Sequence, residues 1–266
     1  MAIYFKTIRS SSSGNCVAIW TDSTRILLDC GLNSMKQTRA ILNEHLWSTE
    51  DVDAVIVSHL HTDHISYYPL RVLEEYGLPI KVHLDCLKQL KSKHFNGDAF
   101  KSLRLESFDK ENFAIGDMVI QPFEVPHQPG YLTHGFIINY KQGKKWKKAV
   151  LVTDFNDGTD VIKHFKDADF IYVESNHDLE LLKLHFNPNS LYHMSNPKTA
   201  DLLYQARKLS KKAPQAIMLG HISSQRNEAS IALKEIRNVF DRNGVELDFN
   251  LYASPLYNYS QVIKLG

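Results

Sequence analysis

Hydrophobic residues fall into two kinds of segment along this chain: short apolar runs typical of strands, and longer segments with apolar residues at helical spacing. Turns rich in serine, glycine and asparagine separate the first three runs, which predict strands at Ile3–Ile8, Cys16–Trp20 and Arg25–Asp29. A helix is predicted from about Ser34 to Leu46. The compact apolar run Asp53–Ser58 then predicts a buried strand.

The rest of the chain alternates strands with helices. The helix predicted from about Ile65 to Tyr76 ends at Gly77 and Pro79, which together stop a helix. Further strands are predicted at Ile80–Leu84, Val119–Val125, Thr133–Tyr140, Ala149–Thr153, Phe170–Glu174, Ala216–Leu219 and Leu247–Tyr252, and further helices at Asp85–Lys93, Pro197–Leu209 and Asn227–Phe240. We interpret Lys141–Lys148 as the turn of a hairpin that joins two of these strands.

The order of these elements predicts the fold class. Several strands followed by alternating helices and strands occur twice, as expected for an α/β protein with two sheets packed face to face and helices outside. This arrangement is a four-layer αββα sandwich. Because no linker rich in proline or glycine divides the chain, residues 1–266 are expected to form a single domain.

Composition narrows the class of protein. Hydrophobic residues make up 43% and charged residues 23%, which fits a soluble globular protein, and the net charge of +1 gives no overall attraction to nucleic acid. The three isolated cysteines, Cys16, Cys30 and Cys86, predict neither disulfides nor a structural zinc site. With no signal-peptide pattern and no apolar run of membrane-spanning length, we expect a cytoplasmic protein without a membrane partner.

A dense group of metal-binding side chains follows the predicted strand Asp53–Ser58. It is the segment His59-Leu60-His61-Thr62-Asp63-His64, which delivers four such groups within six residues. His59 and His61 lie two residues apart, so extended backbone projects both to one side. By chance, the pattern would arise in this chain with a probability of roughly 0.002. We therefore interpret it as a metal site.

Three more candidate ligands follow apolar strands far along the chain. They are His127, Asp154 and His221. A single polar residue at a strand end is commonly a cap or a satisfied core residue. Three of them in a chain that already carries the histidine motif point instead to the additional ligands that a second metal ion would need.

This set of motifs resembles the metallo-β-lactamase-fold superfamily. The resemblance implies that His59, His61 and His127 hold one ion, that Asp63, His64 and His221 hold a second, and that Asp154 bridges them. It also matches Asp29 to an early strand-end aspartate that orients the ligands from outside. Nitrogen and oxygen ligands suit Zn²⁺ or Mn²⁺, with Fe²⁺ possible. Two such ions would acidify a shared water, and Asp63 could relay a proton.

Further motifs resemble one branch of the superfamily, the WalJ or YycJ type, which is associated with 5′-to-3′ exonuclease activity on DNA. They are Ser11–Cys16 (SSSGNC), Leu27–Gly31 (LLDCG), Glu174–Asp178 (ESNHD) and His193–Asn196 (HMSN). Together they cover nearly the whole chain. The resemblance implies a DNA-cleaving hydrolase.

The branch motifs supply candidate residues for substrate contact or for support of the ligands. His193 is a candidate catalytic residue beside Asp63 and Asp154, and both His193 and His177 are candidate phosphate contacts. Ser13 and Asn15 belong to a serine–glycine run that a tight turn would also explain. Asn196 before Pro197 has the pattern of a helix N-cap, so capping is expected as part of its role.

Some residues depart from the branch pattern and leave the substrate open. Phe155-Asn156-Asp157 replaces an expected threonine–glycine, and the segment from Leu219 to Asn227 is longer than usual around His221. The basic run in Lys141–Lys148 would either track a phosphate backbone or form a solvated hairpin tip. The alternative functions are a small-molecule phosphodiesterase acting on a cyclic phosphate, a thioester or lactam hydrolase, and a non-catalytic interaction protein.

Overall fold

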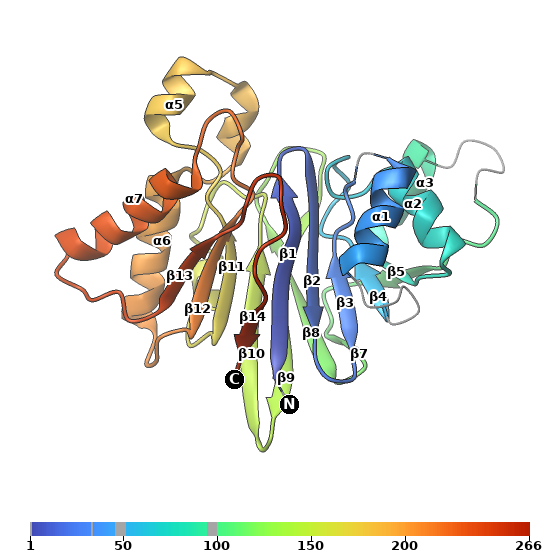
Figure 1. The fold of residues 1–266 in the computed structure, drawn as a ribbon, viewed down its shortest axis with the longest axis horizontal. Helices are drawn as coiled ribbons and strands as arrows, with labels where there is room; N and C mark the ends of the chain where they lie inside the picture. The colour runs from blue at the N-terminus through green and yellow to red at the C-terminus, as the bar shows by residue number, and fades with distance from the viewer. Residues whose placement is uncertain (1, 33, 46–51, 95–99) are drawn as a thin grey trace.

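Two seven-stranded sheets form the centre of the molecule (Figure 1). The computed structural model describes residues 2–32, 34–45, 52–94 and 100–266. The first sheet has the order β14-β1-β2-β3-β4-β5-β6 and the second β13-β12-β11-β10-β9-β8-β7. The strands of the first sheet are β1 Ile3–Ser11, β2 Gly14–Trp20, β3 Arg25–Leu28, β4 Ala54–Ile56, β5 Ile80–His83, β6 Leu105–Phe108 and β14 Ile263–Leu265. Those of the second are β7 Phe113–Ile115, β8 Met118–Val125, β9 Thr133–Gln142, β10 Lys145–Val152, β11 Phe170–Glu174, β12 Ala216–Gly220 and β13 Asn250–Ala253.

Each sheet is part antiparallel and part parallel. The antiparallel pairs include β1–β2 and β2–β3 in the first sheet and β7–β8, β8–β9 and β9–β10 in the second. The parallel strands are β3 to β6 in the first sheet and β10 to β13 in the second. Parallel neighbours need crossover connections, and helices supply most of them. The carboxyl ends of the parallel strands of each sheet therefore lie on one edge, where ligand sites form in α/β folds.

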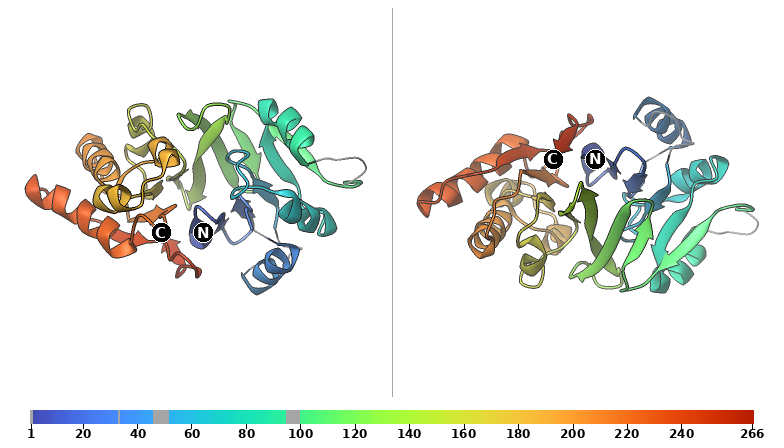
Figure 2. Two further views of the ribbon diagram at one scale, coloured as in Figure 1. Left: turned by 90° about the horizontal axis from the view of Figure 1, so that it is seen from above. Right: turned by 90° about the horizontal axis from the view of Figure 1, so that it is seen from below.

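Helices cover the outer face of each sheet, as Figure 2 shows from above and below. The first sheet is covered by α1 Met35–His45, α2 Tyr67–Glu75 and α3 Leu84–His94. The second sheet is covered by α4 Ile162–Phe165, α6 Asn196–Leu209 and α7 Ala229–Arg242. α5 Leu179–Leu184 and a short 3-10 helix at Pro188–Tyr192 form a lobe beyond the end of the second sheet (Figure 1). No described helix has the length and apolar character needed to cross a bilayer.

Three hydrophobic clusters account for the layers. One lies between the sheets and contains residues of both, such as Phe5, whose ring lies 4.6 Å from that of Phe170. The second joins the first sheet to its helices through residues such as Leu70 and Leu90, and the third joins the second sheet to residues such as Ile236. The predicted four-layer αββα sandwich is thus confirmed.

The predicted elements also occur, with some shifted ends and some omissions. The end of the first predicted helix at Leu46 lies outside the described residues. The omitted elements are β6, β7, β14, α4, α5 and the short 3-10 helix, each between three and six residues long. Such short segments show too few positions for a periodic pattern to be detected.

The prediction that Lys141–Lys148 contains the turn of a hairpin joining two strands is confirmed, but the turn itself is shorter than predicted. β9 continues to Gln142 and β10 begins at Lys145, so the turn consists of Gly143 and Lys144, with Gly143 at φ +60°. Lys141 pairs with Trp146 across the ladder and its Nζ lies 5.2 Å from the indole centroid. Cross-strand pairing therefore outweighs the turn character of the lysine-rich composition.

Candidate metal centre

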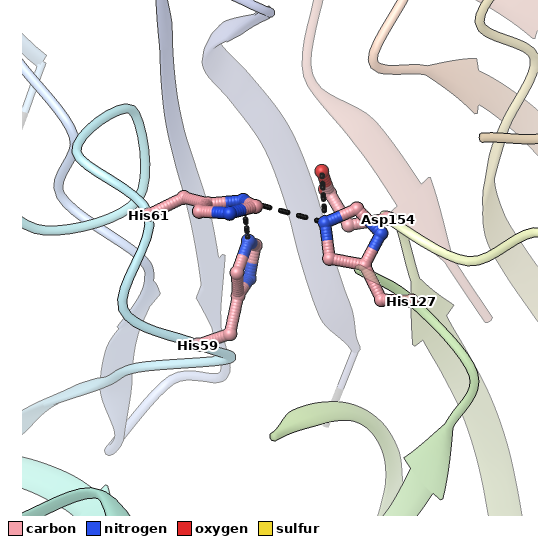
Figure 3. Close-up of side chains that lie close together, drawn as sticks. All are labelled: His59, His61, His127 and Asp154. Carbon is pink, nitrogen blue, oxygen red and sulfur yellow. Dashed lines mark hydrogen bonds and ion pairs between the residues drawn. The ribbon is translucent and has the colours of Figure 1, made fainter. Parts of the chain in front are cut away.

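The seven predicted ligands converge at one edge of the two sheets. His59, His61, Asp63 and His64 lie in the loop between β4 and α2, while the others follow β8, β10 and β12. Figure 3 shows His59, His61, His127 and Asp154 pointing toward one another from three segments. Residues separated by up to 162 positions thus form one cluster that is able to hold metal ions.

The first group consists of three imidazoles and a carboxylate. Nε2 of His59 lies 2.9 Å from Nδ1 of His61, which lies 3.3 Å from Nε2 of His127. Oδ1 of Asp154 lies 3.9 Å from Nε2 of His127. Ligand atoms about 2.0–2.1 Å from one tetrahedral ion would be roughly 3.3 Å apart, so the spacing of these groups fits a metal ion.

The second group lies on the other side of Asp154. Oδ2 of Asp63 is 3.6 Å from Nε2 of His64 and 3.5 Å from Nε2 of His221. The Asp154 carboxylate reaches both of these histidines, with 3.2 Å from Oδ2 to His64 and 3.6 Å from Oδ1 to His221. Asp154 therefore stands between the two groups.

Two buried atoms of the cluster are left without hydrogen-bond partners among the described residues. They are Oδ2 of Asp154 and Nε2 of His221, and both side chains are almost fully buried. A buried polar atom without a hydrogen-bond partner is costly in a folded protein. Both atoms face the cluster, so a cation bound there would satisfy them.

The outward nitrogens of the histidines are held by oxygen acceptors. Nδ1–H of His64 donates to Asp29 at 2.8 Å, Nδ1–H of His127 to the carbonyl of Tyr192 at 3.0 Å, and Nδ1–H of His59 to the hydroxyl of Ser58 at 3.1 Å. These bonds fix the tautomer that leaves Nε2 free toward the cluster.

Asp29 anchors the histidine loop as well as His64. Its Oδ1 accepts the backbone N–H of Ser58 at 2.7 Å, and its Oδ2 accepts the Ser58 hydroxyl at 2.8 Å. The side chain is buried and does not line the pocket at the cluster. Asp29 therefore connects Ser58 and His64 from outside the pocket.

Glu174 is a component that sequence reasoning missed. Its Oε1 accepts Nδ1–H of His193 at 2.7 Å and Nδ1–H of His221 at 2.8 Å, and the side chain is fully buried. Asn176 also supports His221, because its side-chain amide donates to the His221 carbonyl at 3.0 Å. Glu174 ends the buried strand β11, and Asp29 and Asp154 lie just beyond the ends of β3 and β10. The strand-end signal that identified other site residues was therefore present here too.

The β1–β2 turn clamps the histidine loop against β3. The backbone N–H of Asn15 donates to the carbonyl of Asp63 at 2.7 Å, and that of Gly31 donates to the carbonyl of Asn15 at 2.8 Å. A Cβ at Gly31 would overlap with the backbone of Asp63, so glycine is needed for this close approach. Nδ2 of Asn15 lies 2.9 Å from Nε2 of His64, which places Asn15 directly against the cluster.

The histidines divide electrostatically into two sets. Burial lowers the pKa of His59 well below its usual value, that of His61 to about 4, and that of His127 as well. These three are neutral and ready to bind a cation. Burial also opposes charge on His64 and His221, but Asp154 and other carboxylates outweigh it and raise the pKa of His64 well above its usual value and that of His221 to about 10.

The carboxylates of the cluster stay ionised although they are buried. Burial would raise the pKa of Asp154, but His221 and His64 hold it well below its usual value. In the same way, His193 and His221 outweigh the effect of burial on Glu174 and lower its pKa to about 2. So many buried anionic groups in one place require positive charge for stability, which protons or metal ions can provide.

A pocket of about 330 Å³ opens onto the cluster. All of its lining residues are polar: Ser12, His61, Thr62, Asp63, Gln128, Asp154, Asn176, Asn187, Asn189, Ser190, His193, His221 and Arg226. A larger cavity of about 500 Å³ lies near Asn156 and Lys198 and contains none of the predicted ligands. The polar pocket, and not the larger cavity, is therefore where a reacting group would meet the metal-binding side chains.

The candidate substrate residues occupy different positions. His193 lines the pocket. Ser13 does not line it; this residue is exposed, with its hydroxyl 2.9 Å from that of Ser11, and its neighbour Ser12 lines the pocket instead. His177 is buried outside the pocket lining.

The N-cap interpretation of Asn196 was wrong. Ser195 holds the N-cap position, and the buried Asn196 carboxamide instead accepts the Ser175 hydroxyl at 2.7 Å and pairs with Asn227. This amide pair ties the end of β11 to the loop that carries His221.

The basic hairpin tip lies far from the cluster. β10 runs from Lys145 at the tip to Val152, two residues before Asp154. At about 3.3 Å per residue, these eight residues span roughly 25 Å. The tip is at the opposite edge of the sheet (Figure 1), so its lysines do not line the pocket.

Comparison with known proteins agrees with this geometry. The family described as "Beta-lactamase superfamily domain" matches residues 24–222. Exodeoxyribonuclease WalJ of Streptococcus pneumoniae serotype 2 (strain D39) is 28% identical over 264 residues, which cover 94% of each chain. Exodeoxyribonuclease YycJ of Bacillus anthracis is 27% identical over 255 residues, covering 92% of this chain and 91% of that one. The crystal structure of the metallo-β-lactamase-fold protein YhfI from Bacillus subtilis matches with a TM-score of 0.74 and 18% identity, over 99% of this chain and 100% of that one.

Proposed function

The chain belongs to the beta-lactamase superfamily, and on that premise we propose that it is a metal-dependent DNA exonuclease. The observation that carries the proposal is the convergence of seven side chains from four separate segments on one buried cluster beside a polar pocket. The similarity to WalJ and YycJ extends over nearly the whole chain and supports DNA as the substrate.

We propose that the cluster holds two divalent ions, Zn²⁺ or Mn²⁺, with Fe²⁺ as a third candidate. His59, His61 and His127 would hold one ion, Asp63, His64 and His221 the other, and Asp154 both. The ions would supply Lewis acidity and an acidified water. Two ions, two aspartates and one hydroxide leave about one positive charge, which favours an anionic substrate such as a phosphodiester.

The protein groups around the ions have separate tasks. Asp63 is the predicted ligand with the more exposed carboxylate, 21% against 2% for Asp154, so it is placed to take a proton from water. Nδ1 of His193 is fixed by Glu174, which leaves its Nε2 to donate to a phosphoryl oxygen in the pocket. Asp154 positions both halves of the cluster, and Asp29, Asn15 and Asn196 support them from outside.

A small-molecule phosphodiesterase is the second candidate. The volume of about 330 Å³ is at the lower end of the range of about 300–1,000 Å³ for small-molecule pockets, so a single nucleotide would suffice to fill it. The same size also suits an enzyme that takes one nucleotide at a time from a strand end.

The test is a comparison of substrates. Purified protein loaded with Mn²⁺ or Zn²⁺ is incubated with end-labelled DNA, 5′-phosphorylated or not, with bis(p-nitrophenyl) phosphate and with cyclic nucleotides. Release of mononucleotides from DNA is the expected result. Cleavage of the generic ester with intact DNA would overturn the nuclease proposal, and rapid cleavage of a cyclic nucleotide would favour the alternative.

Two variants test the ligand assignment. His61→Ala and Asp154→Ala are expected to abolish turnover of bis(p-nitrophenyl) phosphate and leave the circular dichroism spectrum unchanged. His185→Ala is the control, because His185 is exposed and does not line the pocket. Full activity in either ligand variant would refute the assignment.

We propose that residues 1–266 act as a single domain, since one hydrophobic cluster joins both sheets. We also propose a cytoplasmic location, which the three buried free cysteines support.

A further inference from the structure

Of the described residues that line the polar pocket, Arg226 is the only lysine or arginine. It lies in the loop between His221 and α7, five residues after that predicted ligand. Apart from His193, the remaining wall outside the metal cluster is built of neutral hydroxyl and amide side chains, among them Ser12, Asn176 and Asn187. The pocket therefore has one fixed positive charge besides the cluster.

The backbone on both sides of Arg226 is held in place. Its N–H donates to the hydroxyl of Ser223 at 3.3 Å, and its carbonyl accepts the N–H of Asp178 at 2.8 Å. The next residue, Asn227, is buried and donates to the carbonyl of Ser175 at 2.8 Å. These hydrogen bonds fix the position of the backbone that carries the Arg226 side chain.

The guanidinium itself has little to bind within the described part of the chain. Its Nε is buried and has no hydrogen-bond partner there, and Nη1 donates only to the amide oxygen of Gln225 at 3.2 Å. Other arginines show the usual pairing: Arg207 contacts Asp248 at 2.6 Å and Arg39 contacts Glu75 at 2.7 Å. Arg226 forms no ion pair with any described carboxylate.

A buried guanidinium N–H without a partner is costly, and an anion removes that cost. The planar donors of arginine match the oxygens of phosphate in pairs. The neutral donors around it add hydrogen bonds without repelling a negative charge. The arrangement therefore suits a phosphate group in the pocket.

We propose that Arg226 binds a second phosphate of the substrate, next to the phosphate that is cleaved at the metal cluster. The inference rests on the proposed function, because it assumes a substrate with at least two phosphates. That second phosphate is either the 5′-terminal phosphate of a strand or an internal phosphodiester, and both offer the same oxygens to the guanidinium.

The first experiment uses small probes with the metal-loaded enzyme. Thymidine 3′,5′-bisphosphate and thymidine 5′-monophosphate are compared as inhibitors of bis(p-nitrophenyl) phosphate hydrolysis. The wild type should bind the bisphosphate more tightly than the monophosphate. Arg226→Gln should raise the inhibition constant of the bisphosphate by about tenfold to a hundredfold, as expected for the loss of one charge-assisted hydrogen bond. Arg226→Lys should lose less.

The control is Arg237→Gln, which removes the same charge from an exposed position on α7. It should leave both inhibition constants unchanged. Equal inhibition constants of the bisphosphate for wild type and Arg226→Gln would overturn the proposal, as would a wild type that binds the two probes equally. Equal melting temperatures of the variants verify that the fold is intact.

DNA substrates then identify the source of the phosphate. If Arg226→Gln raises KM only for 5′-phosphorylated DNA, the site binds the terminal phosphate; an equal rise for 5′-hydroxyl DNA assigns it to an internal phosphodiester. If the wild type cleaves no DNA while the probe result holds, the nuclease proposal fails and the phosphate site stands. The two proposals are therefore tested separately.

Discussion

Asp29 and Asp154 hold equivalent positions in the two halves of the molecule. Asp29 directly follows β3 and Asp154 lies two residues beyond β10, and each strand is central in its sheet with one antiparallel and one parallel neighbour. Both residues have φ +60°, a left-handed conformation that is rare outside glycine, and aspartate is among the residues that tolerate it. His221, at φ +49°, follows β12 in the same way. Three site residues thus occupy strained backbone at strand ends, as is common at functional sites.

Asp29→Asn is expected to weaken metal binding by about tenfold to a hundredfold. The amide of asparagine would present an N–H group where Nδ1–H of His64 now donates, which favours the tautomer with hydrogen on Nε2. That tautomer cannot bind the metal through Nε2. Competition with a chelating dye measures the affinity, and excess metal should restore part of the activity.

The control for this change is Asp22→Asn, an exposed carboxylate in a turn of the same sheet. It should leave metal affinity unchanged. Wild-type affinity in Asp29→Asn would show that the contact between Asp29 and His64 does not control the ligand.

The sequence was sufficient to predict the layered fold and to identify the seven side chains that converge. Long apolar strands and a dense histidine motif carry strong signals. Glu174 and Arg226 were missed because their roles depend on what surrounds them: one accepts from two histidines of distant segments, and the other lacks a partner. Asn196 shows the opposite error, since a local capping pattern was outweighed by a buried amide pair with Asn227. Local patterns do not encode such long-range contacts.

Glu174→Gln should impair the site through two histidines at once. The neutral amide still accepts a hydrogen bond but no longer stabilises positive charge on His193 and His221. We expect kcat/KM for a phosphodiester to fall by about tenfold to a hundredfold, with the pH profile shifted, because Glu174 is one of the carboxylates that raise the pKa of His221. Glu111→Gln, at an exposed position, is the matched control. An unshifted pH profile would indicate a purely structural role for Glu174.

Metal binding to the two groups is expected to depend differently on pH. His59, His61 and His127 have lowered pKa values and are neutral above pH 6.5, so an ion bound there displaces few protons. His64 and His221 have raised pKa values, that of His221 about 10, so an ion must displace their protons. Between pH 6 and 9 the affinity of the second ion should therefore rise by about tenfold per pH unit for each proton displaced.

Isothermal titration calorimetry tests this prediction. Titration of the metal-free protein in two buffers with different heats of ionisation counts the protons released at each step. We expect few at the first step and at least one at the second. Equal proton release at both steps would contradict the division of the histidines into two sets.

Away from the metal cluster, His134 should make the fold sensitive to acid. Its ring is buried and stacks on that of His83, with centroids 4.5 Å apart. Burial is the main cause that lowers the pKa of His134 to about 4, and the nearby His83 lowers it further. Between pH 6.5 and 4 the unfolded chain therefore takes up a proton that the folded protein does not bind. The free energy of unfolding should fall in this interval by up to about 3 kcal/mol and change little below it from this group. His134→Phe keeps an aromatic ring against Phe108 and should remove this part of the pH dependence. Urea unfolding at pH 7 and pH 4.5 measures this effect for the variant, the wild type and the exposed-site control His185→Gln. An equal change in the free energy of unfolding between the two pH values in all three proteins would refute the assignment.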